Sequence, residues 1–147
     1  MLQLDFSDVK LRLKQEDSHT KVFDIIRKKW VMLTPEEQVR QYIANYFVQV
    51  MKYPAAMIAI EKKILVGRLT KRFDIIVYER NHKPWMLVEC KAPDIFITEK
   101  TLEQLLNYQR TVQSLYWLLS NGHQTYCANA TDIQNIEWEN NLPAYNL

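Results

Sequence analysis

Two neighbouring apolar stretches near the middle of the chain carry charged residues, and these charges constrain the fold most. Residues 71–79 and 84–91 have the composition of buried β-strands, yet the first holds Asp74 and the second holds Glu89 and Lys91. Side chains alternate faces along a strand, so Glu89 and Lys91 point the same way, roughly 6 to 7 Å apart. A buried carboxylate costs several kcal/mol unless a cation compensates it. The pattern therefore predicts two acids and a lysine at one end of a sheet, together with a cationic partner.

The clearest helix signal begins at Thr34. Thr34 suits the N-cap, Pro35 suits the first helical position, and Glu37, three residues after the cap, completes a capping box. Apolar residues then recur at helical spacing, and a Tyr-Pro pair closes the segment. These signals predict a helix over residues 35–51.

Further strands and a second helix follow. Thr98 opens a segment with apolar residues at helical spacing, and Asn121-Gly122 favours positive φ and predicts a tight hairpin turn. The expected fold is α/β, with a mixed central sheet of four or five strands flanked by helices. The expected strands are 57–66, 71–79, 84–91, 115–120 and 123–128, and the expected helices are 35–51 and 98–113.

Size and composition limit the class of protein. With 147 residues and 48% hydrophobic content, we expect a single domain over 1–147, with an extended or hairpin-like lead-in at 1–20 and a polar tail at 131–147. A net charge of +2 permits a nucleic-acid partner without demanding one. No signal peptide or membrane-spanning stretch is visible, so we expect a cytoplasmic protein with no membrane partner. With only two glycines, the chain has no ATP-binding P-loop.

The two cysteines, Cys90 and Cys127, lack the spacing of a zinc site. We therefore expect reduced thiols. Because Cys90 lies between Glu89 and Lys91, its side chain should face the opposite layer of the sheet, where a packing role is expected over a catalytic one.

Five sequence phrases occur in an order that resembles a known family. They are Leu33-Thr34-Pro35-Glu36-Glu37-Gln38-Val39-Arg40-Gln41, Asp74 in its strand, Val88-Glu89-Cys90-Lys91-Ala92-Pro93, Gln104 with Tyr108, and Ser120-Asn121-Gly122. An aspartate followed by Glu-x-Lys on the next strand resembles the active site of the PD-(D/E)XK nuclease superfamily. The whole set, over about residues 20 to 130, resembles the nuclease domain at the N-terminus of type I restriction enzyme R subunits. The resemblance implies that the expected α/β fold is restriction-endonuclease-like. Those subunits also carry an ATP-driven motor, so the resemblance implies other restriction-system subunits or a separate motor as partners.

The resemblance implies a divalent-metal centre for phosphodiester hydrolysis. Asp74 and Glu89 are the expected ligands of Mg²⁺, with Mn²⁺ as a substitute, and the backbone carbonyl of Cys90 is expected to add an oxygen. Lys91 would orient or deprotonate the attacking water and offset negative charge in the transition state. A structural alternative stays open, in which Glu89 pairs with Lys91 and Asp74 pairs with Arg72.

Other polar residues complete the expected site. Glu37 is either the capping-box glutamate or, as the resemblance implies, a residue that approaches the metal. Arg40, one turn further on, could contact a phosphate or neutralise Glu37. Gln104 and Tyr108 share a helix face, and the resemblance puts Gln104 beside the active site. Arg40, Arg72 and Tyr108 are the expected nucleic-acid contacts.

The sequence therefore predicts a Mg²⁺-dependent endonuclease that acts on DNA and is related to type I restriction. Its expected catalytic residues are Asp74, Glu89, Lys91, Glu37 and Gln104. The alternatives are a nucleic-acid-binding or regulatory module with the same fold and little activity alone, and a protein-interaction scaffold. Neither alternative has a chemical need for the two acids and the lysine together. One active site cuts one strand, so a double-strand break would require a homodimer or two visits.

Overall fold

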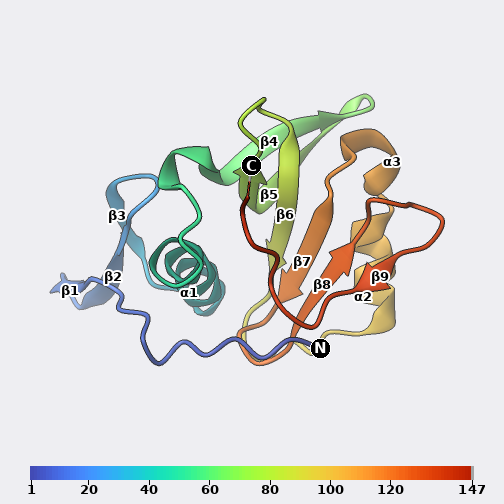
Figure 1. Cartoon of the computed structure of the whole chain (residues 1–147). Helices are drawn as coiled ribbons and strands as arrows, with labels where there is room; N and C mark the ends of the chain where they lie inside the picture. Colours follow the sequence, from blue (N-terminus) through green and yellow to red (C-terminus); the bar gives the residue numbers. More distant parts are fainter. Residues whose placement is uncertain (147) are drawn as a thin grey trace.

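The computed structural model in Figure 1 describes residues 1–146. Its elements, in chain order, are β1 (Leu13–Glu16), β2 (His19–Asp24), β3 (Lys29–Met32), α1 (Pro35–Gln49), the 3-10 turn η1 (Ala55–Met57), β4 (Ile58–Val66), β5 (Leu69–Tyr78), β6 (Pro84–Cys90), α2 (Glu99–Leu106), α3 (Gln109–Val112), β7 (Tyr116–Ser120), β8 (Thr125–Asn129) and β9 (Glu137–Trp138). None of the helices in this range combines the length and the apolar character needed to cross a membrane.

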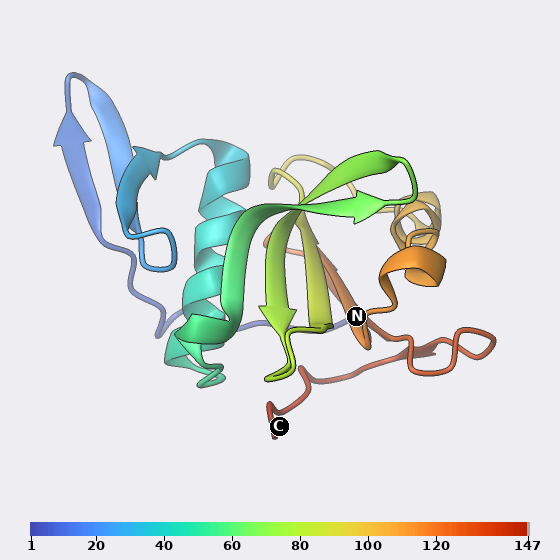
Figure 2. The ribbon, with the colours of Figure 1, turned by 90° about the horizontal axis from the view of Figure 1, so that it is seen from above.

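Within these residues the centre is a six-stranded sheet in the order β4-β5-β6-β7-β8-β9. All neighbouring strands are antiparallel except β6 and β7, which are parallel and are connected through α2 and α3. Helix α1 lies on one face of the sheet and α2 with α3 on the other, while β1, β2 and β3 form a small antiparallel sheet on the far side of α1 (Figures 1 and 2). The predicted α/β class with a mixed sheet between helices is confirmed, but the sheet has one strand more than expected.

Each face of the large sheet has its own apolar core. Because β5 and β6 lie inside the sheet and are covered on both faces, they read in the sequence as nearly continuous apolar runs. Any charged group in these strands therefore stands in a poorly solvated position. The core under α1 includes Val39, Ile43, Phe47, Ile75, Val77 and Val88, and the core under α2 includes Phe73, Leu87, Leu105, Trp117 and Leu119.

Helix α1 begins where the capping signal predicts. The Thr34 side-chain oxygen accepts the Glu37 N–H at 3.1 Å, and Pro35 occupies the first helical position. The reciprocal half of the capping box does not form, because the Thr34 N–H donates to the Met32 carbonyl and the Glu37 carboxylate points to arginine side chains. Glu37 is thus available for the charged network described below.

Replacing Thr34 with alanine should lower the free energy of unfolding by about 1 kcal/mol, because the Glu37 N–H loses its side-chain acceptor. Thr34→Ser keeps an acceptor oxygen and should stay within a few tenths of a kcal/mol of the wild type. Urea unfolding followed by circular dichroism measures both. A Thr34→Ala protein as stable as wild type would show that the cap contributes nothing here.

The helix predicted over 98–113 is divided in two. Thr98 caps α2 as expected, but α2 ends at Leu106 and α3 starts at Gln109. Gln109 is buried, donates to the Ala130 carbonyl at 3.1 Å and accepts the indole N–H of Trp117. These partners lie on β7 and just after β8, so the break depends on contacts that helical periodicity does not contain.

The turn around Asn121-Gly122 is longer than predicted. Gly122 has φ +92°, as the Asn-Gly signal implies, but residues 121–124 form a four-residue loop between β7 and β8. The Asn121 side-chain oxygen accepts the N–H groups of His123 and Gln124, at 2.9 and 2.6 Å. This local bonding stabilises the wider loop.

Both ends of the chain take part in the structure. In the expected lead-in at 1–20, Leu2 pairs with Thr125, and the later residues form most of the β1–β2 hairpin. This hairpin continues past residue 20, to the end of β2 at Asp24. In the expected tail, β9 pairs with β8, and the Tyr145 hydroxyl donates to the Tyr78 carbonyl at 2.7 Å. The aromatic ring of Tyr145 packs against Trp85, which explains why this polar segment is nevertheless ordered against the sheet.

Candidate functional site

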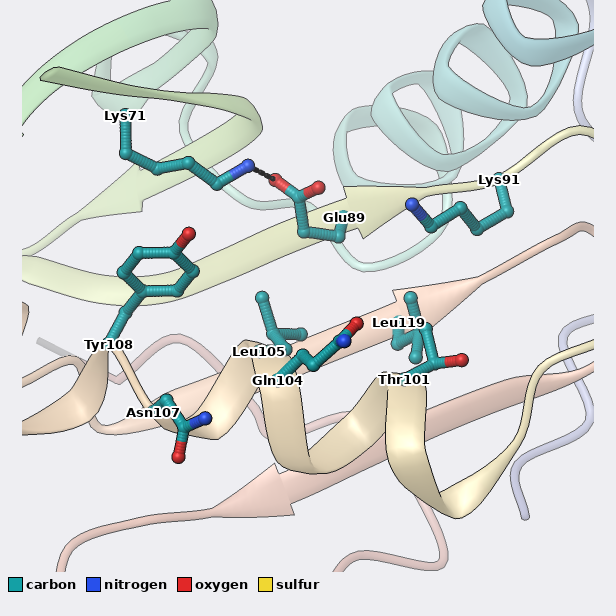
Figure 3. Close-up of a pocket in the computed structure, with 9 residues that line it drawn as sticks. All are labelled: Lys71, Glu89, Lys91, Thr101, Gln104, Leu105, Asn107, Tyr108 and Leu119. Carbon is teal, nitrogen blue, oxygen red and sulfur yellow. Dashed lines mark hydrogen bonds and ion pairs between the residues drawn. The ribbon is translucent and has the colours of Figure 1, made fainter.

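A pocket of about 480 Å³ lies between the end of β6, the first part of β5 and helix α2 (Figure 3). Four residues predicted for the site, Glu89, Lys91, Gln104 and Tyr108, come together in its wall. The lining residues are Lys71, Glu89, Lys91, Thr101, Gln104, Leu105, Asn107, Tyr108 and Leu119. The pocket therefore brings together one carboxylate, two lysine amines and the side-chain amides of Gln104 and Asn107.

Strand alternation on β6 separates the pocket from the core. Glu89 faces α2, whereas Cys90 is buried against α1, as predicted. Burial raises the pKa of the Cys90 thiol well above its ordinary value, which agrees with a packing role. Lys91 follows the strand directly, and its N–H donates to the Ser120 carbonyl at 2.8 Å. This bond continues the β6–β7 pairing by one residue and fixes the lysine at the mouth of the pocket.

Glu89 pairs with a lysine that sequence reasoning missed. The Lys71 amine from β5 lies 3.3 Å from the Glu89 carboxylate, and it also lies over the rings of Phe73 and Tyr108. The side chain of Lys91 forms no hydrogen bond or ion pair within residues 1–146. The alternative of a plain Glu89–Lys91 ion pair is therefore not what the structure contains.

The Glu89 carboxyl gains or loses its proton near neutral pH. Burial raises the pKa of its carboxyl to about 7, and the charge of Asp74 adds to the rise, while Lys71 and Lys91 oppose it. A cation beside Glu89 would favour the ionised form of its carboxyl.

Asp74 does not line the pocket but faces α1. One oxygen of its carboxylate accepts from the Arg40 guanidinium at 2.7 and 3.1 Å, and the other accepts the Cys90 N–H at 2.8 Å. The β5–β6 pairing stops at Ile75 and Val88, so the carboxylate takes the place of the next backbone acceptor. Arg72 is exposed and forms no pair with Asp74 within residues 1–146.

Arg40 and Glu37 belong to the same buried network as Asp74. Arg40 is only 6% exposed, and its guanidinium lies 2.8 Å from Glu37. Arg40 therefore neutralises Glu37, which is one of the two roles that the sequence suggested for it. Glu37 also pairs with Arg27 at 2.9 Å, so two arginines share its carboxylate.

Three further residues complete this network and were not predicted. Arg27 and Asp24 come from the small sheet, and Glu61 comes from β4. The sequence signal for two of them is an aspartate directly after the apolar pair Val22-Phe23, with an arginine three residues later. That signal identifies the local pair but not its partners on other elements.

The backbone is strained at Glu61. Its φ is +53°, a conformation that costs a non-glycine residue about 1 kcal/mol or more. Ile60 pairs with Ile75 and Lys62 with Phe73, whereas Glu61 and Asp74 between them leave the regular pairing. The turned Glu61 carboxylate reaches Arg27 and Arg40, at 3.0 and 3.3 Å, and these ion pairs favour the strained form.

The donor set determines which metal fits. Mg²⁺ is typically held by one or two carboxylates, with water and substrate phosphates completing its shell. Asp74 and Glu89 with the Cys90 carbonyl match that preference, and no thiolate or imidazole ligand for zinc accompanies them. Within residues 1–146 there is no group of three or more His, Cys, Asp or Glu side chains able to hold an ion. The available set thus fits Mg²⁺, provided that Arg40 releases an oxygen of Asp74.

Residues 35–143 match the family model described as type I restriction enzyme R protein N terminus. Among solved structures, a candidate nuclease belonging to DUF820 from Anabaena variabilis aligns with a TM-score of 0.51 and 14% identity, over 90% of this chain and 85% of that one. At this identity the likeness concerns the fold. A search among curated proteins found no match.

The matched region spans α1, the large sheet and both helices of the second layer, and it includes Asp74, Glu89 and Lys91. It starts after β3, so the small sheet lies outside it. Since the match covers most of the chain, the protein belongs to the family of type I restriction enzyme R protein N-terminal domains.

Proposed function

We propose that this protein is a Mg²⁺-dependent endonuclease that cleaves DNA as part of a restriction system. The observation that carries the proposal is the arrangement at the end of the β5–β6 pairing, where Glu89 and the unpaired Lys91 line one pocket and Asp74 accepts the N–H of Cys90 between them. A purely structural ion pair does not explain this arrangement, because the raised pKa of the Glu89 carboxyl lowers stability at neutral and alkaline pH.

Each residue has a chemical task in the proposed site. Bound Mg²⁺ supplies Lewis-acid polarisation of the scissile phosphate and a more acidic water. Asp74, Glu89 and the Cys90 carbonyl would hold the ion. Lys91 orients the attacking water and offsets the negative charge that develops on the phosphate. Gln104 lies on α2 across the pocket from Lys91 and can position the water or the phosphate by its amide (Figure 3).

Glu37 is proposed in a supporting task. Its carboxylate is shared by Arg27 and Arg40, so it reaches the metal centre through Arg40 and Asp74. The role implied by the family resemblance, an approach of this glutamate to the metal, is thus proposed as an indirect one.

The DNA contacts are proposed on the β4–β5 hairpin and at the pocket rim. Arg72 is exposed and lies directly opposite Lys63 on the neighbouring strand. Like charges in opposite positions destabilise a sheet, so a phosphate between them would relieve the repulsion. Tyr108, at the pocket wall beside Lys71, offers a ring and a hydroxyl to the same strand of DNA.

Replacing Arg72 with alanine should weaken DNA binding severalfold and reduce the slope of log affinity against log salt by about one. The rate of cleavage at saturating DNA should stay unchanged, because Arg72 lies outside the pocket. Fluorescence anisotropy over a salt series measures the slope. Lys29→Ala, which changes an exposed lysine on β3, is the control. An Arg72→Ala slope equal to that of the control would show that Arg72 does not contact DNA.

The experiment that tests the function uses the wild-type protein with supercoiled and single-stranded DNA. Nicking is expected in Mg²⁺ or Mn²⁺ and none in a chelator. Metal binding without any cleavage would instead support a nucleic-acid-binding or regulatory module, the second candidate. The Asp74–Arg40 pair favours that candidate, because it must open before an ion enters. Absence of both binding and cleavage would contradict the enzyme.

A further inference from the structure

The small sheet ends in a rigid anchor for one arginine. Asp24, at the end of β2, is completely buried, and its carboxylate accepts the N–H groups of Ile26 and Arg27 at 2.9 and 2.7 Å. The same carboxylate accepts from Arg27 Nε at 2.6 Å and from Gln41 at 2.9 Å. Four bonds to one aspartate therefore fix the guanidinium of Arg27 between the small sheet and α1.

The outer nitrogens of Arg27 reach two other elements. One donates to Glu37 on α1 at 2.9 Å and the other to Glu61 on β4 at 3.0 Å. Arg27 thus connects three carboxylates from three separate elements. It is the charged contact between the small sheet and the network, beside the neutral link that Gln41 of α1 makes from Asp24 to Glu37.

The network continues from these carboxylates to the candidate metal ligand. Glu37 and Glu61 both contact Arg40, at 2.8 and 3.3 Å, and Arg40 contacts Asp74 at 2.7 Å. Five acids, Asp24, Glu36, Glu37, Glu61 and Asp74, thus share two arginines. Without Arg27, Glu37 and Glu61 would have only Arg40 as a close cation, and their combined charge would draw it away from Asp74.

Stability alone is a weak explanation for this arrangement. Buried ion pairs give little net stabilisation over apolar residues of the same volume, and the network also includes the strained backbone of Glu61. What such a network provides is a fixed orientation of its members. The member at its end is Asp74, whose second oxygen accepts the Cys90 N–H.

We propose that Arg27 is a positioning residue for Asp74, acting through Glu37, Glu61 and Arg40. The small sheet, which lies outside the matched family region, is then a working part of the site because it carries Asp24 and Arg27. The coupling of Arg27 to the position of Asp74 does not depend on the proposed function. The effect of this coupling on metal binding rests on the proposed function.

The test compares Arg27→Ala and Arg27→Lys with Lys29→Ala, an exposed control on the same sheet. The first measurement is the Cys90 amide resonance in ¹⁵N–¹H spectra, because this N–H donates to Asp74 at 2.8 Å. The second is Mn²⁺ affinity by calorimetry. Arg27→Ala should move the Cys90 resonance and weaken Mn²⁺ binding tenfold or more, as loss of an outer supporting contact typically does. Arg27→Lys keeps the charge and should recover part of both, and Lys29→Ala should change neither.

A folded Arg27→Ala protein with the wild-type Cys90 resonance and wild-type Mn²⁺ affinity would overturn the proposal. If Arg27→Ala does not fold, the same two measurements on Arg27→Lys decide, since this variant loses the forked contacts but not the charge. If the wild type itself takes up no Mn²⁺, the proposed function fails separately. The Cys90 resonance then decides the coupling by itself, with movement supporting it and no movement overturning it.

Discussion

Lys91→Met protein should fold and bind DNA close to the wild-type level, and yet cleave DNA about a thousandfold more slowly. Loss of one preorganised donor at a developing charge typically costs a hundredfold to a thousandfold in rate. The Lys91 side chain has no hydrogen bond or ion pair in the described structure, so its removal breaks no internal contact. Single-turnover cleavage of a plasmid in Mg²⁺ measures the rate.

The matched control for this variant is Lys100→Met, which changes an exposed lysine on α2 outside the pocket lining. It should cleave at the wild-type rate. A soluble Lys91→Met protein that cuts as fast as the control would show that the lysine has no part in the chemistry. A Lys91→Met protein that unfolds would point to a structural role instead.

Glu89→Gln should make the metal-free protein more stable at alkaline pH while abolishing cleavage. The folded pKa of Glu89, about 7, lies above its ordinary value of 4.5, so the folded protein holds this proton more tightly than the unfolded chain does. Wild-type stability therefore falls as the pH rises from about 4.5 through 7, and the full penalty is present above 7. At about 1.4 kcal/mol per pKa unit, the penalty is about 3 kcal/mol.

Glutamine carries no charge at any pH, so it avoids this penalty. The gain from Glu89→Gln should reach about 3 kcal/mol at pH 8 to 9 and vanish below pH 4.5. Urea unfolding at several pH values measures it, with the exposed Glu103→Gln on α2 as a control that should stay within 0.5 kcal/mol of the wild type. A Glu89→Gln gain that does not depend on pH would contradict the assigned titration.

Local patterns predicted much of the fold because they act within one element. The Thr34 cap and the apolar spacing after it define α1, and apolar runs define β5 and β6. The break between α2 and α3 could not be predicted, since Gln109 finds its partners on distant segments. Strand β9 is two residues long and exists only by pairing with β8.

The candidate site shows the same division. Alternation on β6 predicted that Glu89 and Lys91 share a face, and the family resemblance placed Gln104 beside them; all three line one pocket. Tyr108 also lines it, although it lies in the break between α2 and α3 and not on one helix face with Gln104. The ion pairs could not be predicted from such local spacing. Arg72, two residues from Asp74 on the same strand, was the expected partner, whereas in the structure Asp74 pairs with Arg40 from α1. The choice of partner depends on how α1 packs against the sheet, which no local pattern records.

The most direct test of the metal centre is anomalous diffraction from crystals grown with Mn²⁺. We expect an anomalous peak beside the carboxylates of Asp74 and Glu89 and the carbonyl of Cys90. We also expect Arg40 to have released one oxygen of Asp74 while it keeps its contact with Glu37. A structure in which Asp74 stays paired with Arg40, with no peak beside Glu89 at saturating Mn²⁺, would contradict the proposed metal centre.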